Sequence, residues 1–160
     1  MDLIYKSTLG KLSLVAVIFC CALQAQAHTV ALAPQERSTL LQFVVDTHPS
    51  LANLLTKAGL TPILSSDDAY TILAPPDESL KSLENESAQK IRTVLSGHIL
   101  KGKYLETDLK DGATVETLAG TKVTICRKKD YTLVDGIKIV KANQAVKNGV
   151  VHDINGLIKI

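Results

Sequence analysis

The stretch "NGVVHDINGLIKI" at residues 148–160 allows two opposite interpretations of this chain. Adjacent His152 and Asp153 suggest a catalytic or metal-binding site. The Asn-Gly pairs on either side instead indicate a strand held between turns. Neighbouring side chains of a strand point to opposite faces, so Asp153 cannot orient the imidazole of His152. The stretch therefore predicts a buried, hydrogen-bonded His152 and no catalytic dyad.

Alternating apolar and polar residues before this strand predict two β-hairpins. The turn of the first is Ala119-Gly120, and the turn of the second is Asp135-Gly136, a pair typical of two-residue hairpin loops. The first half of the chain repeats its apolar residues at helical spacing, apart from a short strand at 69–73. A helix-rich first half and a strand-rich second half predict an α+β fold rather than alternating β-α-β units.

Three longer helices are expected in the first half, and capping chemistry predicts their ends. Ser50 is the expected N-cap of the second helix, and Gly59 is expected to end it. Ser87 and Gly97 have the same roles in the third helix. Glu36 is expected in the first turn of the first helix. The apolar stripe of that first helix is expected to consist of Leu40, Leu41, Val44 and Val45.

The N-terminus predicts export from the cytoplasm. Residues 1–27 combine two lysines, an apolar run at 12–23, and Ala25 and Ala27 before a cleavage site. The run is shorter than the roughly 20 apolar residues that span a bilayer, which is typical of a signal peptide. The mature chain is therefore expected to begin at His28 and to carry no transmembrane segment.

Export predicts a secreted or extracytoplasmic protein, in the periplasm or at the cell surface if the source is bacterial. The expected organisation is a tether at 28–35 followed by one domain at 36–160. A lipid anchor on Cys20 or Cys21 is an alternative, against which the bulky Phe19 argues.

Composition and motifs argue against several classes of function. A net charge of +2 and an aromatic content of 4% provide neither the field nor the stacking surfaces for nucleic acid. The sequence has no HExxH, no paired CxxC and no clustered histidines, so we expect neither a metal nor a cofactor. It also lacks a nucleophile elbow, a phosphate loop and a dinucleotide fingerprint. We therefore expect no enzymatic activity.

Cys126 is the one cysteine outside the predicted signal peptide, so it has no partner for an intramolecular disulfide. Its place at the end of a predicted strand favours an inert, half-buried thiol. The alternative is an exposed, reactive thiol beside the basic residues 127–129, which could form a disulfide-linked dimer.

Three stretches, in this order, resemble the signatures of the fasciclin domain, an extracellular adhesion module: "YTILAPPDESLKSL" (70–83), "HILKGKY" (98–104) and "NGVVHDING" (148–156). The resemblance covers nearly the whole mature chain. It implies a β-sheet wedge packed against several helices, and a role in adhesion rather than catalysis. The residues that match the family motifs are Tyr70, Thr71, Ala74, Pro75, Asp77, His98, Gly102, Tyr104, Asn148, Gly149 and His152.

Asp77 has two expected roles within the first signature. As an N-cap, its carboxylate would accept hydrogen bonds from free amide groups at the start of the following helix. The resemblance also implies that Asp77 holds His98 in place.

The chain departs from the family pattern at several positions. Gly97 stands where many animal members carry a Tyr before the central His, and that pair is associated with integrin recognition. Its absence argues against integrin binding. Asp153 replaces an apolar residue, so it needs a partner if it is buried.

These features favour a secreted or cell-surface adhesion module without catalytic activity. Its partner would be an extracellular or surface protein or a polysaccharide, and surface display or a weak homo-oligomer would supply avidity. The alternative is an extracytoplasmic carrier or sensor that holds a small apolar ligand in a cleft between helices and sheet. A glycosylation sequon at Asn85 favours neither function.

Overall fold

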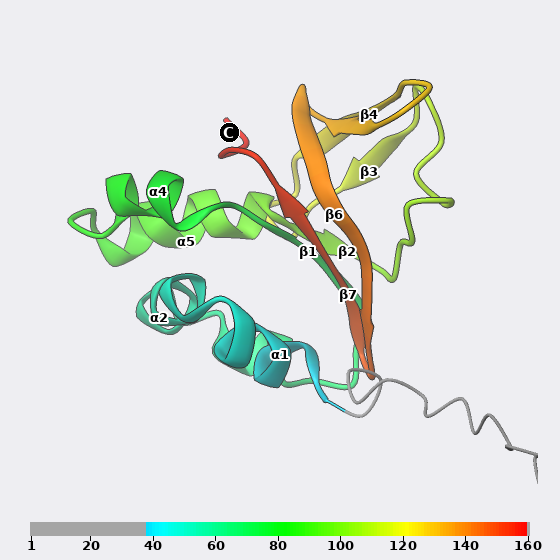
Figure 1. Ribbon diagram of the computed structural model, residues 1–160. Coiled ribbons are helices and arrows are strands. Elements are labelled where there is room, and N and C mark those ends of the chain that lie inside the picture. Colours follow the sequence, from blue (N-terminus) through cyan, green and yellow to red (C-terminus); the bar gives the residue numbers. More distant parts are fainter. Residues whose placement is uncertain (1–37, 160) are drawn as a thin grey trace, which may run out of the picture. The chain divides into compact units, whose positions relative to one another are not determined.

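The computed structural model describes residues 38–159 (Figure 1). The predicted signal peptide, the tether and the predicted domain start at residue 36 lie outside the described residues. Helices precede most of the strands, and the predicted α+β class is confirmed. None of the described helices is long and apolar enough to cross a membrane. The helices are α1 (Leu40–Thr47), α2 (Pro49–Lys57), α3 (Thr61–Leu64), α4 (Asp77–Leu80), the 3₁₀-helix η2 (Lys81–Leu83) and α5 (Ala88–Gly97).

The strands form one mixed sheet in the order β2-β1-β7-β6-β5-β4-β3. β1 and β7 run parallel, and the other neighbouring pairs are antiparallel. A bridge between Leu100 and Thr117 joins β2 to the residue after β3, so the two edges of the sheet meet and the sheet curls. The strands are β1 (Tyr70–Ala74), β2 (Ile99–Lys101), β3 (Thr114–Glu116), β4 (Lys122–Arg127), β5 (Thr132–Val134), β6 (Ile137–Val146) and β7 (Gly149–Ile154).

The β1–β7 pair separates two hydrophobic cores. Ile72 and Ala74 of β1 pack in the core beneath the helices, whereas Leu73 between them packs in the core of the curled sheet. Val151 and Ile154 of β7 divide between the two cores in the same way. Figure 1 shows the helices on one side of this pair and β3 and β4 on the other. Burial of both faces explains why apolar residues occupy both faces of these strands and not only alternate positions.

Both predicted hairpins are present. β3 pairs with β4 across the turn that contains Ala119-Gly120, and β5 pairs with β6 across Asp135-Gly136. Asp135 and Gly136 have φ angles of 51° and 82°. These are the left-handed values that a two-residue hairpin loop requires.

Two predicted helix starts are wrong. The hydroxyl of Thr39 caps α1, so the helix begins at Leu40 and Glu36 lies before it, outside the described residues. α2 begins at Pro49, directly after its N-cap His48, and Ser50 lies inside the helix. Proline is favoured at a first helical position because it lacks an N–H group that would have no intrahelical partner there.

Two other predicted ends are confirmed. Gly59 follows the C-cap of α2 with a φ of 66°, which favours glycine. Ser87 caps α5, since its Oγ accepts a hydrogen bond from the Lys90 amide at 3.3 Å. The predicted stripe of α1 is wrong at Val45, which is 47% exposed, while Phe43 is buried instead.

Gly149 is the first residue of β7, where this strand approaches the backbone of β1 very closely. It pairs with Tyr70 in the parallel β1–β7 ladder. A Cβ at this position would overlap the Tyr70 carbonyl oxygen and lie 2.9 Å from Leu40 Cδ1. Glycine is therefore required here by the approach of two backbones, not by an unusual φ.

Gly149→Ala is expected to lower the free energy of unfolding by about 3 kcal/mol or more, because the backbone of Tyr70 cannot move without breaking its strand pairing. Urea denaturation measures the change. Gly156→Ala is the matched control, since the nearest atom to its new Cβ is Ile137 Cδ1 at 3.6 Å. The control should change stability by less than about 0.5 kcal/mol. Equal midpoints for the two variants would contradict the close approach.

Candidate functional site

The three sequence signatures meet in one part of the sheet. They contribute β1, β2 and β7, which are neighbours in the order β2-β1-β7. The segments 70–83, 98–104 and 148–156 are far apart in the sequence but adjacent in the fold. The signature side chains are therefore the first place to look for a functional site.

Asn148 joins the β6–β7 turn to two helices. Its Oδ1 accepts a hydrogen bond from the Leu40 amide at 2.7 Å, at the start of α1. Its Nδ2 donates to the carbonyl oxygens of Leu64 at 3.2 Å and Ser66 at 2.8 Å, at the end of α3. Asn148 is 8% exposed, and its amide is occupied by these contacts. Its role in the structure is to position α1 and α3 against the sheet.

Thr71 holds the segment that follows β2 against β1. Its hydroxyl donates to the Gly102 carbonyl at 2.8 Å and accepts from the Tyr104 amide at 2.9 Å. Gly102 has a φ of 113°, and a Cβ there would lie 3.1 Å from the Tyr104 ring. Gly102 therefore allows the half-buried Tyr104 ring to fold back over the backbone.

His152 is fully buried in β7, and both of its ring nitrogens are occupied. The Asn143 amide donates to Nδ1 at 3.1 Å, which makes Nε2 the protonated nitrogen. Nε2 donates to the Tyr104 carbonyl at 2.9 Å. Burial lowers the pKa of His152 below its ordinary value, against the Tyr104 carbonyl and the charges of Glu106 and Asp153, which raise it. His152 is a neutral group that ties β7 to β6 and to the segment after β2.

His98 is also buried, with the opposite tautomer. The Ile158 amide donates to its Nε2 at 3.0 Å, so Nδ1 carries the proton and donates to the Val94 carbonyl at 2.9 Å. Burial lowers the pKa of His98, and the bond to the Val94 carbonyl opposes this effect. The two histidines share no partner, and each ties separate segments together.

Both expected roles of Asp77 are wrong. α4 has Pro76 as its N-cap, and the extended ψ of 151° at Pro76 lets the helix begin at Asp77 itself. The Asp77 carboxylate is exposed and makes no hydrogen bond within residues 38–159, because the ring of His98 is already satisfied elsewhere. Ala74 and Pro75, in contrast, are buried at the end of β1.

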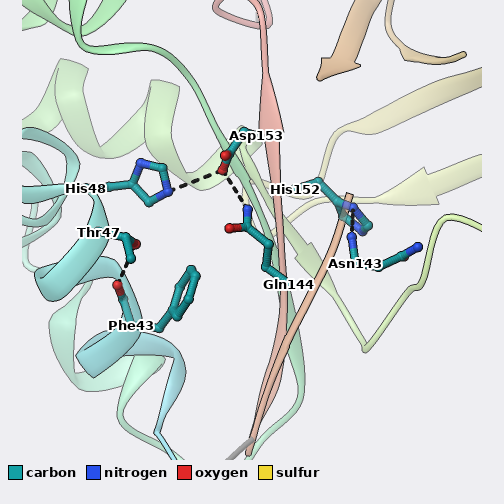
Figure 2. A network of polar contacts seen from close by, with 7 residues as sticks. All are labelled: Phe43, Thr47, His48, Asn143, Gln144, His152 and Asp153. Carbon is teal, nitrogen blue, oxygen red and sulfur yellow. Dashed lines mark hydrogen bonds and ion pairs between the residues drawn. The ribbon is translucent and has the colours of Figure 1, made fainter. Parts of the chain in front are cut away.

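Asp153 points to the opposite face from His152, as Figure 2 shows, and takes part in a polar contact that the sequence did not predict. Its Oδ1 lies 3.2 Å from Nε2 of His48 and accepts a hydrogen bond from Nε2 of Gln144 at 2.8 Å. His48 occupies the junction of α1 and α2, and Gln144 lies on β6. The contact therefore joins the helical layer to the sheet, and it supplies the partners that a half-buried carboxylate needs.

The electrostatics of Asp153 fit this arrangement. Partial burial raises the pKa of Asp153. The hydrogen bonds from His48 and Gln144 and the charges of His48 and Lys141 lower the pKa, and together they outweigh the effect of burial. The net pKa is below the ordinary value of an aspartate. Asp153 is thus an ionised group in the folded protein at neutral pH.

The other candidate groups do not assemble into a reactive centre. No group of three or more His, Cys, Asp or Glu residues in the described part of the chain could hold a metal ion. Cys126 is a free, half-buried thiol on β4, opposite Leu133 of β5. Its reactivity stays a prediction.

Comparisons with known proteins agree with the resemblance of the signatures. The sequence profile of the fasciclin domain matches residues 46–160, and the chain belongs to this family. It is 29% identical over 123 residues to transforming growth factor-beta-induced protein ig-h3 of Sus scrofa, across 72% of this chain and 18% of that protein. It is 23% identical over 129 residues to human periostin, across 80% of this chain and 15% of that protein.

The fold also matches a solved structure of the same family. That structure is a FAS1 domain pair from the insect cell adhesion molecule fasciclin I, with a TM-score of 0.62 and 13% identity. The match covers 78% of this chain and 52% of that one. This chain spans less than a fifth of the length of ig-h3 and periostin, so it corresponds to one unit of much longer proteins.

Asn148→Asp is expected to lower the free energy of unfolding by about 3 kcal/mol, at least as much as Asn148→Ala does. The near-isosteric carboxylate would face the carbonyl oxygens of Leu64 and Ser66, where the amide now donates. Asn155→Asp is the matched control, because Asn155 is exposed and its side chain only accepts, from the Lys138 amide. It should lose less than about 1 kcal/mol. Chemical denaturation at neutral pH compares the variants, and a fully stable Asn148→Asp protein would refute the donor role.

The free energy of unfolding is expected to fall as the pH drops below about 6.5, the ordinary pKa of histidine. The pKa values of His98 and His152 are lowered in the folded protein, so the unfolded chain binds more protons in this range and acid favours unfolding. Below the ordinary aspartate pKa of 3.8, protonation of Asp153 adds to the loss.

Urea denaturation from pH 7.5 to pH 5 measures the trend. His152→Asn should be less stable at pH 7.5 but less sensitive to pH. A wild-type stability that is constant or rises toward pH 5 would exclude neutral buried histidines.

Proposed function

We propose that this protein is a non-catalytic adhesion or interaction module that acts outside the cytoplasm. Membership of the fasciclin domain family carries the proposal. The fold supports it, since the matched solved structure comes from an insect cell adhesion molecule. Its partner would be an extracellular or surface protein or a polysaccharide, and the mature chain would begin at His28.

The hydrogen bonding of the signature side chains supports a binding role over a catalytic one. Thr71, His98, Asn148 and His152 use their polar atoms to join segments of the domain itself. A catalytic acid, base or nucleophile has to reach a substrate, and these buried groups are already paired within the fold. Recognition would therefore depend on exposed side chains rather than on these buried groups.

The alternative, a carrier of a small apolar ligand, has less support. The buried residues form two packed clusters on either side of the β1–β7 pair. A groove of about 320 Å³ beside α5 is open, and Gln89, Arg92 and Thr93 make one of its walls polar. An apolar ligand would favour a more enclosed and more apolar cavity.

Beads that carry many copies of residues 28–160 are expected to attach to the surface or extracellular matrix of the source organism, and a single soluble copy should compete only weakly. Light microscopy or flow cytometry counts the attached beads. Beads coated with heat-denatured protein control for the need for a folded domain. Attachment no better than this control would refute adhesion, and a stoichiometric lipid that co-purifies with the protein would favour the carrier instead.

A further inference from the structure

The groove beside α5 has one polar wall and one apolar wall. Four residues of α5, at the helical spacing of one face, form the polar wall: Gln89, Arg92, Thr93 and Ser96. Ile63 of α3 and Leu118 of the β3–β4 turn form the apolar wall, next to the fully buried Leu60. A groove of about 320 Å³ is at the lower end of the range for small-ligand sites.

Ser96 adds a hydroxyl to the polar wall of the groove. The residue is 8% exposed, and its Oγ makes no hydrogen bond within the part of the chain that the structure describes. No fully enclosed side-chain polar atom there lacks a partner, so the Ser96 hydroxyl faces the open space of the groove. Thr93 differs, because its hydroxyl already donates to the Gln89 carbonyl. Ser96 is therefore a hydroxyl that the groove leaves open to solvent or to a ligand.

Arg92 supplies the charge of the groove. Its Nη1 donates to the carbonyl oxygens of Ala58 at 3.2 Å and Gly59 at 3.4 Å, which holds the guanidinium against the end of α2. The Nε and Nη2 groups have no partner among the described residues. Arg92 is the one charged side chain among the groove-lining residues, all of which lie within 38–159. A fixed guanidinium with unused donors is suited to a carboxylate.

We propose that this groove binds an acidic peptide segment of a protein partner, with a carboxylate on Arg92 and an aliphatic side chain against Ile63 and Leu118. The Ser96 hydroxyl donates to the same ligand, at its carboxylate or a backbone carbonyl. No aromatic side chain lines the groove, which favours an aliphatic-acidic peptide over the face of a sugar ring. The inference rests on the proposed function, because it names the class of partner that such a module would recognise.

The test uses acetyl-Leu-Asp-amide, whose one charge is the side-chain carboxylate, and acetyl-Leu-Asn-amide as the neutral probe. Titration of ¹⁵N-labelled protein, residues 28–160, should shift the amide signals of α5 and the β3–β4 turn. The Asn peptide should bind about tenfold more weakly, the effect of one charge-assisted hydrogen bond. Equal affinities for the two peptides would overturn the carboxylate contact. Tighter binding of galacturonic acid at the same signals would replace the peptide with an acidic sugar.

Variants at Ala119, an exposed residue on the groove rim, test the charge without touching the fold. Ala119→Glu should weaken binding of the Asp peptide about tenfold, whereas the isosteric Ala119→Gln should change it less than about threefold. Lys90→Gln removes a charge from α5 outside the groove, where Lys90 pairs with Glu86, and should have no effect. Equal effects of Glu and Gln at Ala119 would reduce the result to a steric block and overturn the proposal.

The bead assay separates this inference from the proposed function. If Ala119→Glu beads attach as well as wild-type beads, adhesion stands and the groove is not its docking site. If wild-type beads fail to attach but the Asp peptide binds at α5, the groove stands and the adhesion role fails.

Discussion

The parallel contact between β1 and β7 is the constraint on which the rest of the domain depends. At its start, Gly149 lies against the Tyr70 carbonyl so closely that no side chain fits. The adjacent Asn148 then bonds to α1 and α3, so strand pairing and helix docking are set by two consecutive residues. Parallel strands need a long connection, and here the connection consists of all the residues between Ala74, the end of β1, and Gly149, the start of β7.

The fold class and several local features could be predicted from the sequence, but the partners of the buried polar groups could not. The Asp135-Gly136 hairpin and the Ser87 cap depend on a few neighbouring residues, and both are as predicted. The start of α2 differs from the prediction because Pro49 and Ser50 both have the chemistry of a helix start. Asp77 does not hold His98, because the backbone of Val94 and Ile158 already occupies both ring nitrogens of His98. The sequence does not show which groups these are.

The contact of Asp153 with His48 and Gln144 could be predicted from the sequence only in part. Strand alternation predicts that Asp153 faces away from His152, and it does. It does not predict which group lies on that face, because His48 reaches Asp153 only after the α1–α2 pair has docked on the sheet. The sequence shows that a half-buried carboxylate needs a partner, but the identity of that partner depends on the packing of distant elements.

The signatures that identify the family are therefore a specification of the fold rather than of a ligand. His98 and His152 hold fixed, opposite tautomers because each accepts a backbone N–H, and protonation of either would place two donors face to face. These side chains cannot be replaced to suit a different binding partner without destabilising the fold. On the proposed function, specificity comes from exposed positions, such as Arg92 and Ala119 around the α5 groove. Two domains with identical signatures can then differ entirely in what they bind, because the residues that set the partner lie outside the residues that set the fold.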